Sequence, residues 1–349
     1  EGLRFILEPS YYKRYEDNRW YNLKTSLRCG ASNKQFNANV TYSYFYMPVK
    51  FARYTISAGT DIVQYNGREP ISELINTFYT LLVKENYLKL YKKAYASVSQ
   101  SKEMVNGVVL RTSAEYAERY SLQNTSNYQP FKKPVREYTS NDPLNPLNED
   151  NAFQQHQALI ISAELRLRYK QKYYTRPNRK VIIGSKYPTL SISYKKGING
   201  LGSDIDYDFI RIGVDDEIKL GLLGTSEYNV GLGKFINSKK MGFMDFQHFS
   251  GNQTIIAGFR LEDFKALDYF TYSTNDQYIE GHFQHNFGGF ILNKFPLIKK
   301  LRLNEIGSVH YLSNNLINQY IEFSAGIQRG IIPFKAEFVT SFAEKKKAF

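Results

Sequence analysis

The chain is short of cysteine, tryptophan and long apolar runs. Its 349 residues include one cysteine, Cys29, and one tryptophan, and the mean hydropathy is −0.47. A single cysteine excludes an internal disulfide framework. No stretch approaches the roughly 18 apolar residues of a membrane-spanning helix, which excludes a helical membrane protein. A β-barrel is not excluded, because its strands carry their apolar residues in alternation with polar ones.

The charge is also one-sided. Lysine and arginine number 46 against 33 aspartate and glutamate residues, a formal net charge of +13. Such an excess first suggests nucleic acid. The basic residues, however, are spread over turns and over the polar positions of alternating segments, as Lys195 and Lys196 illustrate. We therefore expect a charged lumen or contact with anionic lipid headgroups, and no nucleic-acid partner.

What the sequence does contain is an alternation with a period of two. Between residues 36 and 46 every second side chain is apolar or aromatic: Phe36, Ala38, Val40, Tyr42, Tyr44 and Tyr46. A second run has the same pattern: Leu159, Ile161, Ala163, Leu165, Leu167 and Tyr169. A strand points successive side chains to opposite faces, so each run has an apolar and a polar face. Runs of roughly ten residues match a tilted transmembrane strand better than the ~5–6 residues of a soluble strand.

These runs predict an all-β chain that forms a transmembrane antiparallel β-barrel of about 14–16 strands over residues 1–349. The 29 tyrosines and 24 phenylalanines suit the aromatic girdles of such a barrel, and a tyrosine-rich soluble β-protein is the alternative. We place fifteen candidate strands near 2–14, 18–31, 36–47, 50–65, 87–101, 106–120, 156–171, 187–197, 207–220, 225–235, 254–262, 277–288, 299–312, 318–329 and 332–343. Bacterial barrels have even strand counts, so we expect one further strand, and an exported chain that starts at Glu1 implies preceding sequence.

Two insertions interrupt the alternation. Residues 70–85 place six apolar side chains at helical spacing, which predicts a short amphipathic helix that plugs the lumen, lies at the membrane interface or packs on the barrel rim. A ragged strand is the alternative there. Residues 121–155 are polar and contain four prolines, which predicts a long polar surface loop.

Strand parity assigns candidate side chains to the two faces. The candidates for lining the lumen are Glu164, Arg166, Arg168, Glu280, His282 and Gln284. The candidates for facing lipid are Tyr42, Tyr44, Leu165, Leu167 and Phe338.

Catalytic and metal-binding patterns are sparse. Glu280 and His282 share a strand face, but a zinc site needs three or four converging ligands. Ser308 and His310 lie two apart on one face, and such neighbours rarely form a nucleophile–base pair without a third orienting group. We therefore predict a protein that is not an enzyme and that has no metal and no cofactor, with a membrane-embedded hydrolase as a minor alternative.

Several blocks resemble an outer-membrane barrel family of Bacteroidota whose function is unknown. They are residues 71–95, 187–210, 248–254 (HFSGNQT) and 268–312. Members of that family commonly carry an N-terminal carboxypeptidase-like regulatory domain, and its absence from these residues agrees with the expected missing N-terminal sequence. The C-terminal third is more distantly similar to BamA-like surface-antigen barrels, which have an inward-folded loop with an Arg-Gly-aromatic motif. The nearest run here, Gly258, Phe259 and Arg260, has a different order.

The resemblance implies a multi-pass barrel in the bacterial outer membrane. Together with the missing catalytic set, it predicts a non-enzymatic component of envelope biogenesis, protein export or transport within a multi-protein complex. Its expected partners are outer-membrane lipid, lipopolysaccharide and other outer-membrane or periplasmic proteins. A solute channel, selective through lumen charges such as Glu164 and Arg166, is the alternative.

Overall fold

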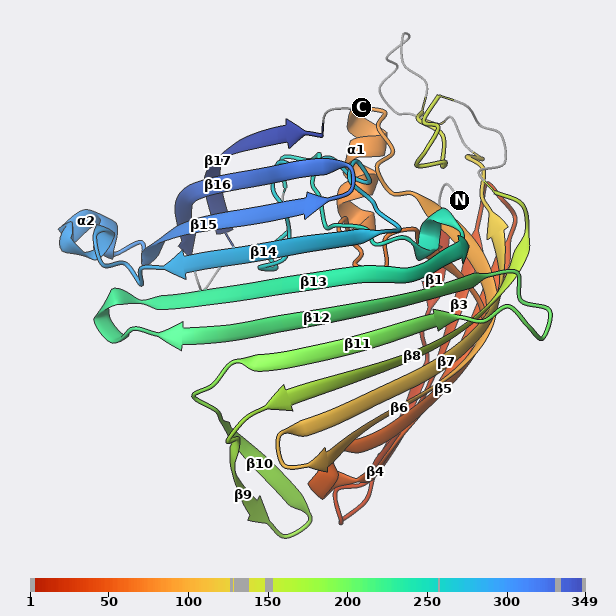
Figure 1. Cartoon of the computed structure of the whole chain (residues 1–349), viewed down its shortest axis with the longest axis horizontal. Coiled ribbons are helices and arrows are strands. Elements are labelled where there is room, and N and C mark those ends of the chain that lie inside the picture. The colour runs from red at the N-terminus through yellow and green to blue at the C-terminus, as the bar shows by residue number, and fades with distance from the viewer. Residues whose placement is uncertain are drawn as a thin grey trace. The chain divides into compact units, whose positions relative to one another are not determined.

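The computed structural model of the chain describes residues 4–125, 128, 138–147, 153–256, 258–329 and 334–346. These residues form long β-strands and two short α-helices, α1 (Glu73–Leu82) and α2 (Pro296–Lys299) (Figure 1). The strands are β1 (Arg4–Leu7), β2 (Ser10–Arg14), β3 (Trp20–Gly30), β4 (Phe36–Met47), β5 (Ala52–Gln64), β6 (Leu90–Val105), β7 (Val108–Ser121), β8 (His156–Arg168), β9 (Lys172–Arg176), β10 (Arg179–Gly184), β11 (Thr189–Gly197), β12 (Asp206–Lys219), β13 (Thr225–Lys240), β14 (Gln277–Asn286), β15 (Leu303–Asn314), β16 (Ile317–Arg329) and β17 (Phe334–Lys345).

Fifteen of these strands belong to one large antiparallel sheet. Its order is β1-β3-β4-β5-β6-β7-β8-β11-β12-β13-β14-β15-β16-β17, with β2 also paired to β3, and β9 and β10 form a separate hairpin. From β3 to β8 and from β11 to β17, neighbours in sequence are neighbours in the sheet, as hairpin connections produce. The structure therefore confirms the predicted all-β antiparallel fold, the strand number between 14 and 16, and the short helix within residues 70–85.

The chain divides into two compact units. Unit 1 consists of Glu1–Lys186, Ser193–Phe209 and Ile236–Phe246, and unit 2 of Tyr187–Ile192, Ile210–Phe235 and Gln247–Phe349. Strands β1 to β10 lie in unit 1 and strands β14 to β17 in unit 2. The long connection between β13 and β14 therefore belongs mostly to unit 2.

In unit 1 the strand register sorts side chains by polarity. One row of directly paired residues across β3 to β8 is entirely polar: Asn22, Ser43, Thr55, Ser99, Ser113 and Ser162. The adjacent row, on the opposite face, is apolar or aromatic: Leu23, Tyr42, Ile56, Val98, Ala114 and Ile161. We call the faces that contain these rows the polar face and the apolar face of unit 1. Ile56 and Val98 are each 50% exposed, so the described residues leave the apolar face open there.

Unit 2 shows the same separation on β14, β15 and β16. His282, His310 and Glu322 form one row of paired residues and are all buried. The next row, on the opposite face, contains Phe283, Val309 and Phe323, which are 37–44% exposed. These rows define the polar face and the apolar face of unit 2. Polar side chains are inside and apolar side chains are outside, the reverse of a soluble fold.

Three of the predicted elements differ from the structure. The described residues of the predicted strand 254–262 form no strand, because that stretch belongs to an irregular segment, residues 247–276, which we call the strap. Here Asn252 and Thr254 satisfy backbone groups of the strap itself, and such local bonds compete with strand pairing. The predicted strand 2–14 is two strands, β1 and β2, with Pro9 between them. The hairpin β9–β10 was predicted as a connection.

Helix α1 begins after Ser72, whose side chain accepts a hydrogen bond from the Ile75 amide at 3.3 Å, a normal N-cap. Leu74, Phe78 and Leu82, spaced four apart, are all at least 50% exposed. The polar Asn76, in contrast, is buried. The helix thus presents its apolar stripe outward. Among the described residues, no helix is both long and apolar enough to traverse a bilayer.

Candidate functional site

The densest group of buried polar side chains in unit 2 lies on the polar face of β14, β15 and β16. Glu280, His282, Ser308, His310 and Glu322 are each between 0% and 4% exposed. We call these five residues the buried polar cluster. Residues two apart on a strand, or opposite each other on paired strands, share a face, and this places the five side chains together. The sequence predicted the placement of Glu280 and His282 on this face.

Four members of the cluster form a chain of contacts. Ser308 Oγ lies 2.9 Å from His310 Nε2, and His310 Nδ1 lies 2.9 Å from His282 Nδ1. His282 Nε2 is 3.8 Å from Glu280 Oε2. In the histidine–histidine contact one ring nitrogen donates and the other accepts, so the two rings hold complementary protonation at these atoms. The Ser308–His310 pair, a weak hint in the sequence, is therefore a contact in the structure.

The strap binds this cluster through one lysine and its backbone. Lys265 Nζ donates to Ser308 Oγ at 2.6 Å, to Ser324 Oγ at 2.8 Å and to Glu337 Oε1 at 2.6 Å. The backbone amides of Lys265 and Ala266 donate to the Glu322 carboxylate at 2.8 and 2.6 Å. Burial lowers the pKa of Lys265, and the Glu337 carboxylate opposes that shift.

Phe264 completes the closure. Its side chain is fully buried, with its ring centroid 4.9 Å from that of His282 and 5.9 Å from that of His310. Tyr320 packs on the same phenylalanine at 5.8 Å. An aromatic ring here covers the side of the histidine pair that faces away from the sheet. The strap therefore fits the cluster with both polar and apolar contacts.

This arrangement is poorly suited to catalysis. A serine beside a histidine is the core of many nucleophilic sites, but Ser308 Oγ is also bonded to Lys265 and Ser324. Its side chain is 4% exposed, and an enzymatic role stays untested. The residues that the structure describes contain no group of three or more His, Cys, Asp or Glu that could hold a metal ion. The cluster's chemistry fits anchoring of the strap.

The candidate lumen residues of unit 1 lie half-buried on β8. Glu164 pairs with Arg111 of β7 at 3.2 Å and lies 3.9 Å from Arg166. The backbone amide of Arg168 donates to the Gly107 carbonyl at 2.7 Å, at the strand end. In unit 2, Gln284 Oε1 accepts from Lys335 at 2.9 Å. Their role as lumen lining stays a prediction.

The candidate lipid-facing residues lie on the apolar faces. The Tyr42 ring contacts those of Tyr21 and Tyr54, and Tyr44 contacts Tyr54. Leu165 and Leu167 pair with Leu110 and Val108 of β7 and are half-buried. Phe338 of β17 is 79% exposed. Contact with lipid stays a prediction for all five.

The buried ion pairs that sequence reasoning missed include one on the polar face of each unit. Arg119 of unit 1 binds Asp245 through two hydrogen bonds of 2.8 and 2.9 Å, and their side chains are 4% and 2% exposed. In unit 2 the missed pair is Lys265 with Glu337. Both pairs join a strand to a residue far away in the sequence. A fully buried arginine or lysine is rare, and this rarity is what marks the two pairs in the structure. Burial cannot be read from a sequence, so the sequence offered no signal for them.

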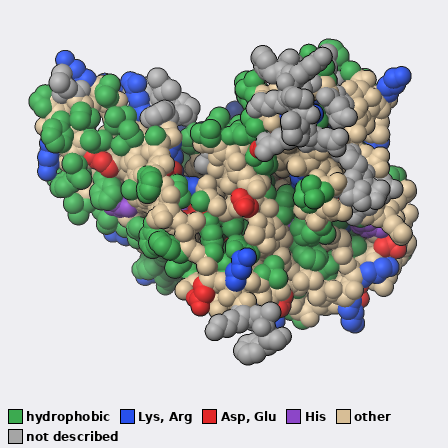
Figure 2. Space-filling view, turned by 90° about the horizontal axis from the view of Figure 1, so that it is seen from above, with side chains coloured by type: hydrophobic (Ala, Val, Ile, Leu, Met, Phe, Trp, Pro, Cys, Tyr) green, Lys and Arg blue, Asp and Glu red, His purple; other side chains and the backbone are tan. Residues whose placement is uncertain are grey.

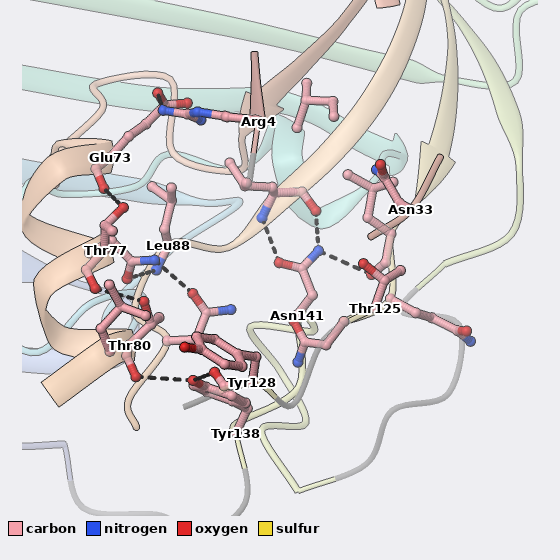
Figure 3. A pocket seen from close by; sticks show the side chains of 18 of the residues that line it. Arg4, Asn33, Glu73, Thr77, Thr80, Leu88, Thr125, Tyr128, Tyr138 and Asn141 are labelled. Atoms are coloured by element: carbon pink, nitrogen blue, oxygen red, sulfur yellow. Dashed lines mark hydrogen bonds and ion pairs between the residues drawn. The ribbon is translucent and has the colours of Figure 1, made fainter. Parts of the chain in front are cut away.

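A cavity of about 510 Å³ lies in unit 1 beside α1 (Figure 3). Arg4 and Arg28 flank the single carboxylate of Glu73 at its wall. Tyr138 donates to the Thr80 carbonyl at 3.0 Å, and Asn141 binds the backbone of β6. These polar groups already bond within the wall, so we read the cavity as a packing gap between α1, the strands beside it and the neighbouring loops.

Residues 1–327 match the model of a protein family of unknown function, the DUF5686 C-terminal domain. The chain belongs to this family. The match covers most of the chain and is more specific than the resemblance of separate sequence blocks. The bacterial group and the N-terminal regulatory domain of that resemblance stay predictions. A search of curated proteins gives no match for this DUF5686 domain.

Solved structures similar to the DUF5686 domain include three outer-membrane proteins. BamA from Haemophilus ducreyi lacking POTRA domains 1–3 has a TM-score of 0.46 and 13% identity, over 100% of this chain and 68% of that one. A double mutant of the Rh. blastica porin has a TM-score of 0.36 and 10% identity, over 97% of this chain and 88% of that one. CdiB from Acinetobacter baumannii has a TM-score of 0.37 and 11% identity, over 98% of this chain and 59% of that one. These similarities are too weak to carry an argument about function, which therefore depends on the geometry of the sheet faces and the strap.

Proposed function

We propose that this chain is a non-enzymatic β-barrel component of the bacterial outer membrane, with a role in envelope biogenesis, protein export or transport. The polarity of the two sheet faces carries the proposal. In unit 2 the buried side is polar, as at His310 and Glu322, and the exposed side is apolar, as at Phe323. Hydrocarbon, rather than water, is the solvent that favours such a surface.

The visible surface supports a membrane location. Figure 2 shows hydrophobic side chains gathered in several patches on one face, with acidic and basic side chains scattered between them. Large exposed apolar areas mark membrane or protein contacts. The outward stripe of α1, with Leu74 and Phe78, is a further exposed apolar area and suits an interfacial helix.

The strap supports a role other than free diffusion of solutes. It lies on the polar face of unit 2, where an open pore would keep water. Its anchors, the Lys265–Glu337 ion pair and the amides bonded to Glu322, are buried. A segment held in this way favours a closed or partner-gated barrel, which suits a component of an export or biogenesis complex.

The first test is membrane integration. The chain purified from native membranes is expected to need detergent for solubility. It should also migrate differently on an electrophoresis gel before and after boiling, because a folded barrel resists the denaturing detergent of the gel until it is heated. A soluble monomer without detergent would refute the proposal. Copurification from the same membranes is expected to bring a defined set of outer-membrane or periplasmic proteins, with lipopolysaccharide.

A solute channel is the second candidate, and one observation favours it. The polar face of unit 1 carries half-buried ion pairs, such as Lys93 with Glu115 at 2.7 Å and Arg111 with Glu164. Charges of both signs can line a selective pore. Planar-bilayer recording separates the two candidates, because a steady open-pore current favours the channel and a silent bilayer favours the gated component.

A further inference from the structure

The hairpin β9–β10 of unit 1 has an unbalanced charge. Residues 169–186 contain no aspartate or glutamate and six basic residues: Lys170, Lys172, Arg176, Arg179, Lys180 and Lys186. Figure 1 shows the hairpin beyond the end of β8, as a two-stranded element of its own. An isolated hairpin in water is marginally stable, so something in the fold must hold this one in place.

A buried group of hydrogen-bonded side chains, which we call the knot, holds it: Glu103, Asn106, Gln171 and Lys180. Lys180 Nζ donates to the Glu103 carboxylate and, at 2.8 Å, to Asn106 Oδ1 in the turn between β6 and β7. Gln171 Nε2 donates to Glu103 Oε1 at 2.9 Å. The side chains of Lys180 and Glu103 are 6% and 4% exposed. Lys180 is thus buried in an internal contact of the fold.

The opposite face of the hairpin points away from this knot. The register pairs Arg176 with Arg179 and Tyr174 with Val181, and Lys172 shares their face by strand parity. Lys172, Arg176 and Arg179 are exposed, and Tyr174 is 43% exposed. The Arg176 guanidinium lies 5.4 Å from the centroid of the Tyr174 ring. We call Lys172, Tyr174, Arg176 and Arg179 the basic hairpin face.

We propose that the basic hairpin face binds the anionic phosphate headgroups of membrane lipid. The proposal rests on the proposed membrane location, because β8, which leads into the hairpin, and its neighbour β7 present an apolar face to hydrocarbon in that account. Tyrosine together with lysine and arginine is the composition of residues that anchor a protein at the border of the hydrocarbon. Guanidinium groups bind phosphate with two hydrogen bonds, and the strand register places Arg176 and Arg179 directly opposite each other.

The test uses the full chain with a single reporter tryptophan on the hairpin. In a Trp20→Phe background, Tyr174→Trp places the reporter on the basic hairpin face. The protein is reconstituted in vesicles that contain phosphatidylglycerol and phosphatidylcholine, with a quencher near the top of the acyl chains of one lipid or the other. The ratio of quenching gives the relative association of the two lipids with the hairpin.

We expect phosphatidylglycerol to be preferred by roughly five-fold or more, since each basic residue beside an anionic surface contributes about that factor. The variant Lys172→Gln/Arg176→Gln/Arg179→Gln should bring the ratio close to one, and 0.5 M salt should lower it. The matched control, Lys34→Gln/Lys239→Gln/Lys240→Gln, removes three exposed lysines outside the hairpin and should keep the preference.

Three outcomes separate the inference from the proposed function. No quenching by either lipid would refute the membrane location itself. Equal quenching by both lipids, or a preference that survives the triple glutamine substitution, would overturn the headgroup site and leave the membrane location standing. Inorganic phosphate at matched ionic strength should leave the ratio unchanged, and if it abolished the preference, the site would be one for free phosphate instead.

Discussion

The polar faces of the two units have the same origin and different environments. In unit 1, strand register aligns serine and threonine hydroxyls that remain half-buried, and among the described residues only its ends carry buried charges such as the Arg119–Asp245 pair. In unit 2, the polar face carries histidines and glutamates that the strap covers almost completely. Alternation determines which side chains share a face, but a segment outside the strands determines whether that face meets water. Similar strands can thus surround either a hydrated region or a closed polar core.

The largest expected effect is on unit 1. Arg119→Ala leaves Asp245 buried and without its cation, which should lower the free energy of unfolding by about 3–5 kcal/mol. Urea unfolding in lipid vesicles measures this loss. The double variant Arg119→Met/Asp245→Leu removes both charges and should recover most of the stability. If the single and double variants were equally unstable, the ion pair would not be the cause.

The second prediction removes the cover from unit 2. Phe264→Ala takes away the ring that packs on His282 and His310, and truncation of a buried phenylalanine costs roughly 3 kcal/mol or more. We expect faster proteolysis within 247–276, and a current in planar bilayers where the native protein is silent. Phe259→Ala is the matched control, because that strap residue is 61% exposed. Unchanged proteolysis in the Phe264 variant would show that the strap is held by other contacts.

A smaller effect is expected for hydroxyl pairs on the polar face of unit 1. Ser113 and Ser162 are 2.7 Å apart, so Ser113→Ala should lower the free energy of unfolding by about 1 kcal/mol. The same unfolding assay measures it. A loss as large as that of Arg119→Ala would mean that this part of the face excludes water as completely as the buried polar cluster does. The contrast between the units would then fail.

The smallest effect is expected at Glu164. Its partner Arg111 is 48% exposed, so Glu164→Gln should change stability by no more than about 1 kcal/mol, and less at high salt. If the second candidate function were right, this variant would instead shift the anion-to-cation selectivity of a measurable current. A small change in stability would place Glu164 in a hydrated environment, and a shift in selectivity would place it beside the ion path. A large loss of stability would place it in a packed interior.

The sequence predicted the strands well because their signal is local. Residues 36–47 were predicted as a strand, and β4 has those same bounds, since every position contributes to the alternation. Face assignments such as His282 follow from parity alone. The strap was mistaken for a strand over 254–262, because scattered apolar residues such as Ile255 imitate the pattern, while its side-chain bonds to backbone are invisible in the sequence.

The site could be predicted only in part for a related reason. Ser308 and His310 were visible as neighbours, but Lys265 lies 43 residues from Ser308 in the sequence. Nothing in the residues around Lys265 indicates burial. Likewise, 126 positions separate Arg119 and Asp245. Contacts of this kind depend on how a connection folds back onto a sheet, and a single sequence contains no periodic signal for that.

The central claim is that the apolar faces meet hydrocarbon, and spin labels test it most directly. In a Cys29→Ser background, single cysteines replace Ile56 and Val98 on the apolar face, and Thr55 and Ser99 on the polar face. In vesicles, labels at Ile56 and Val98 should be relaxed mainly by oxygen, and labels at Thr55 and Ser99 mainly by a water-soluble nickel complex. Equal accessibility of all four positions to the nickel complex would contradict the account.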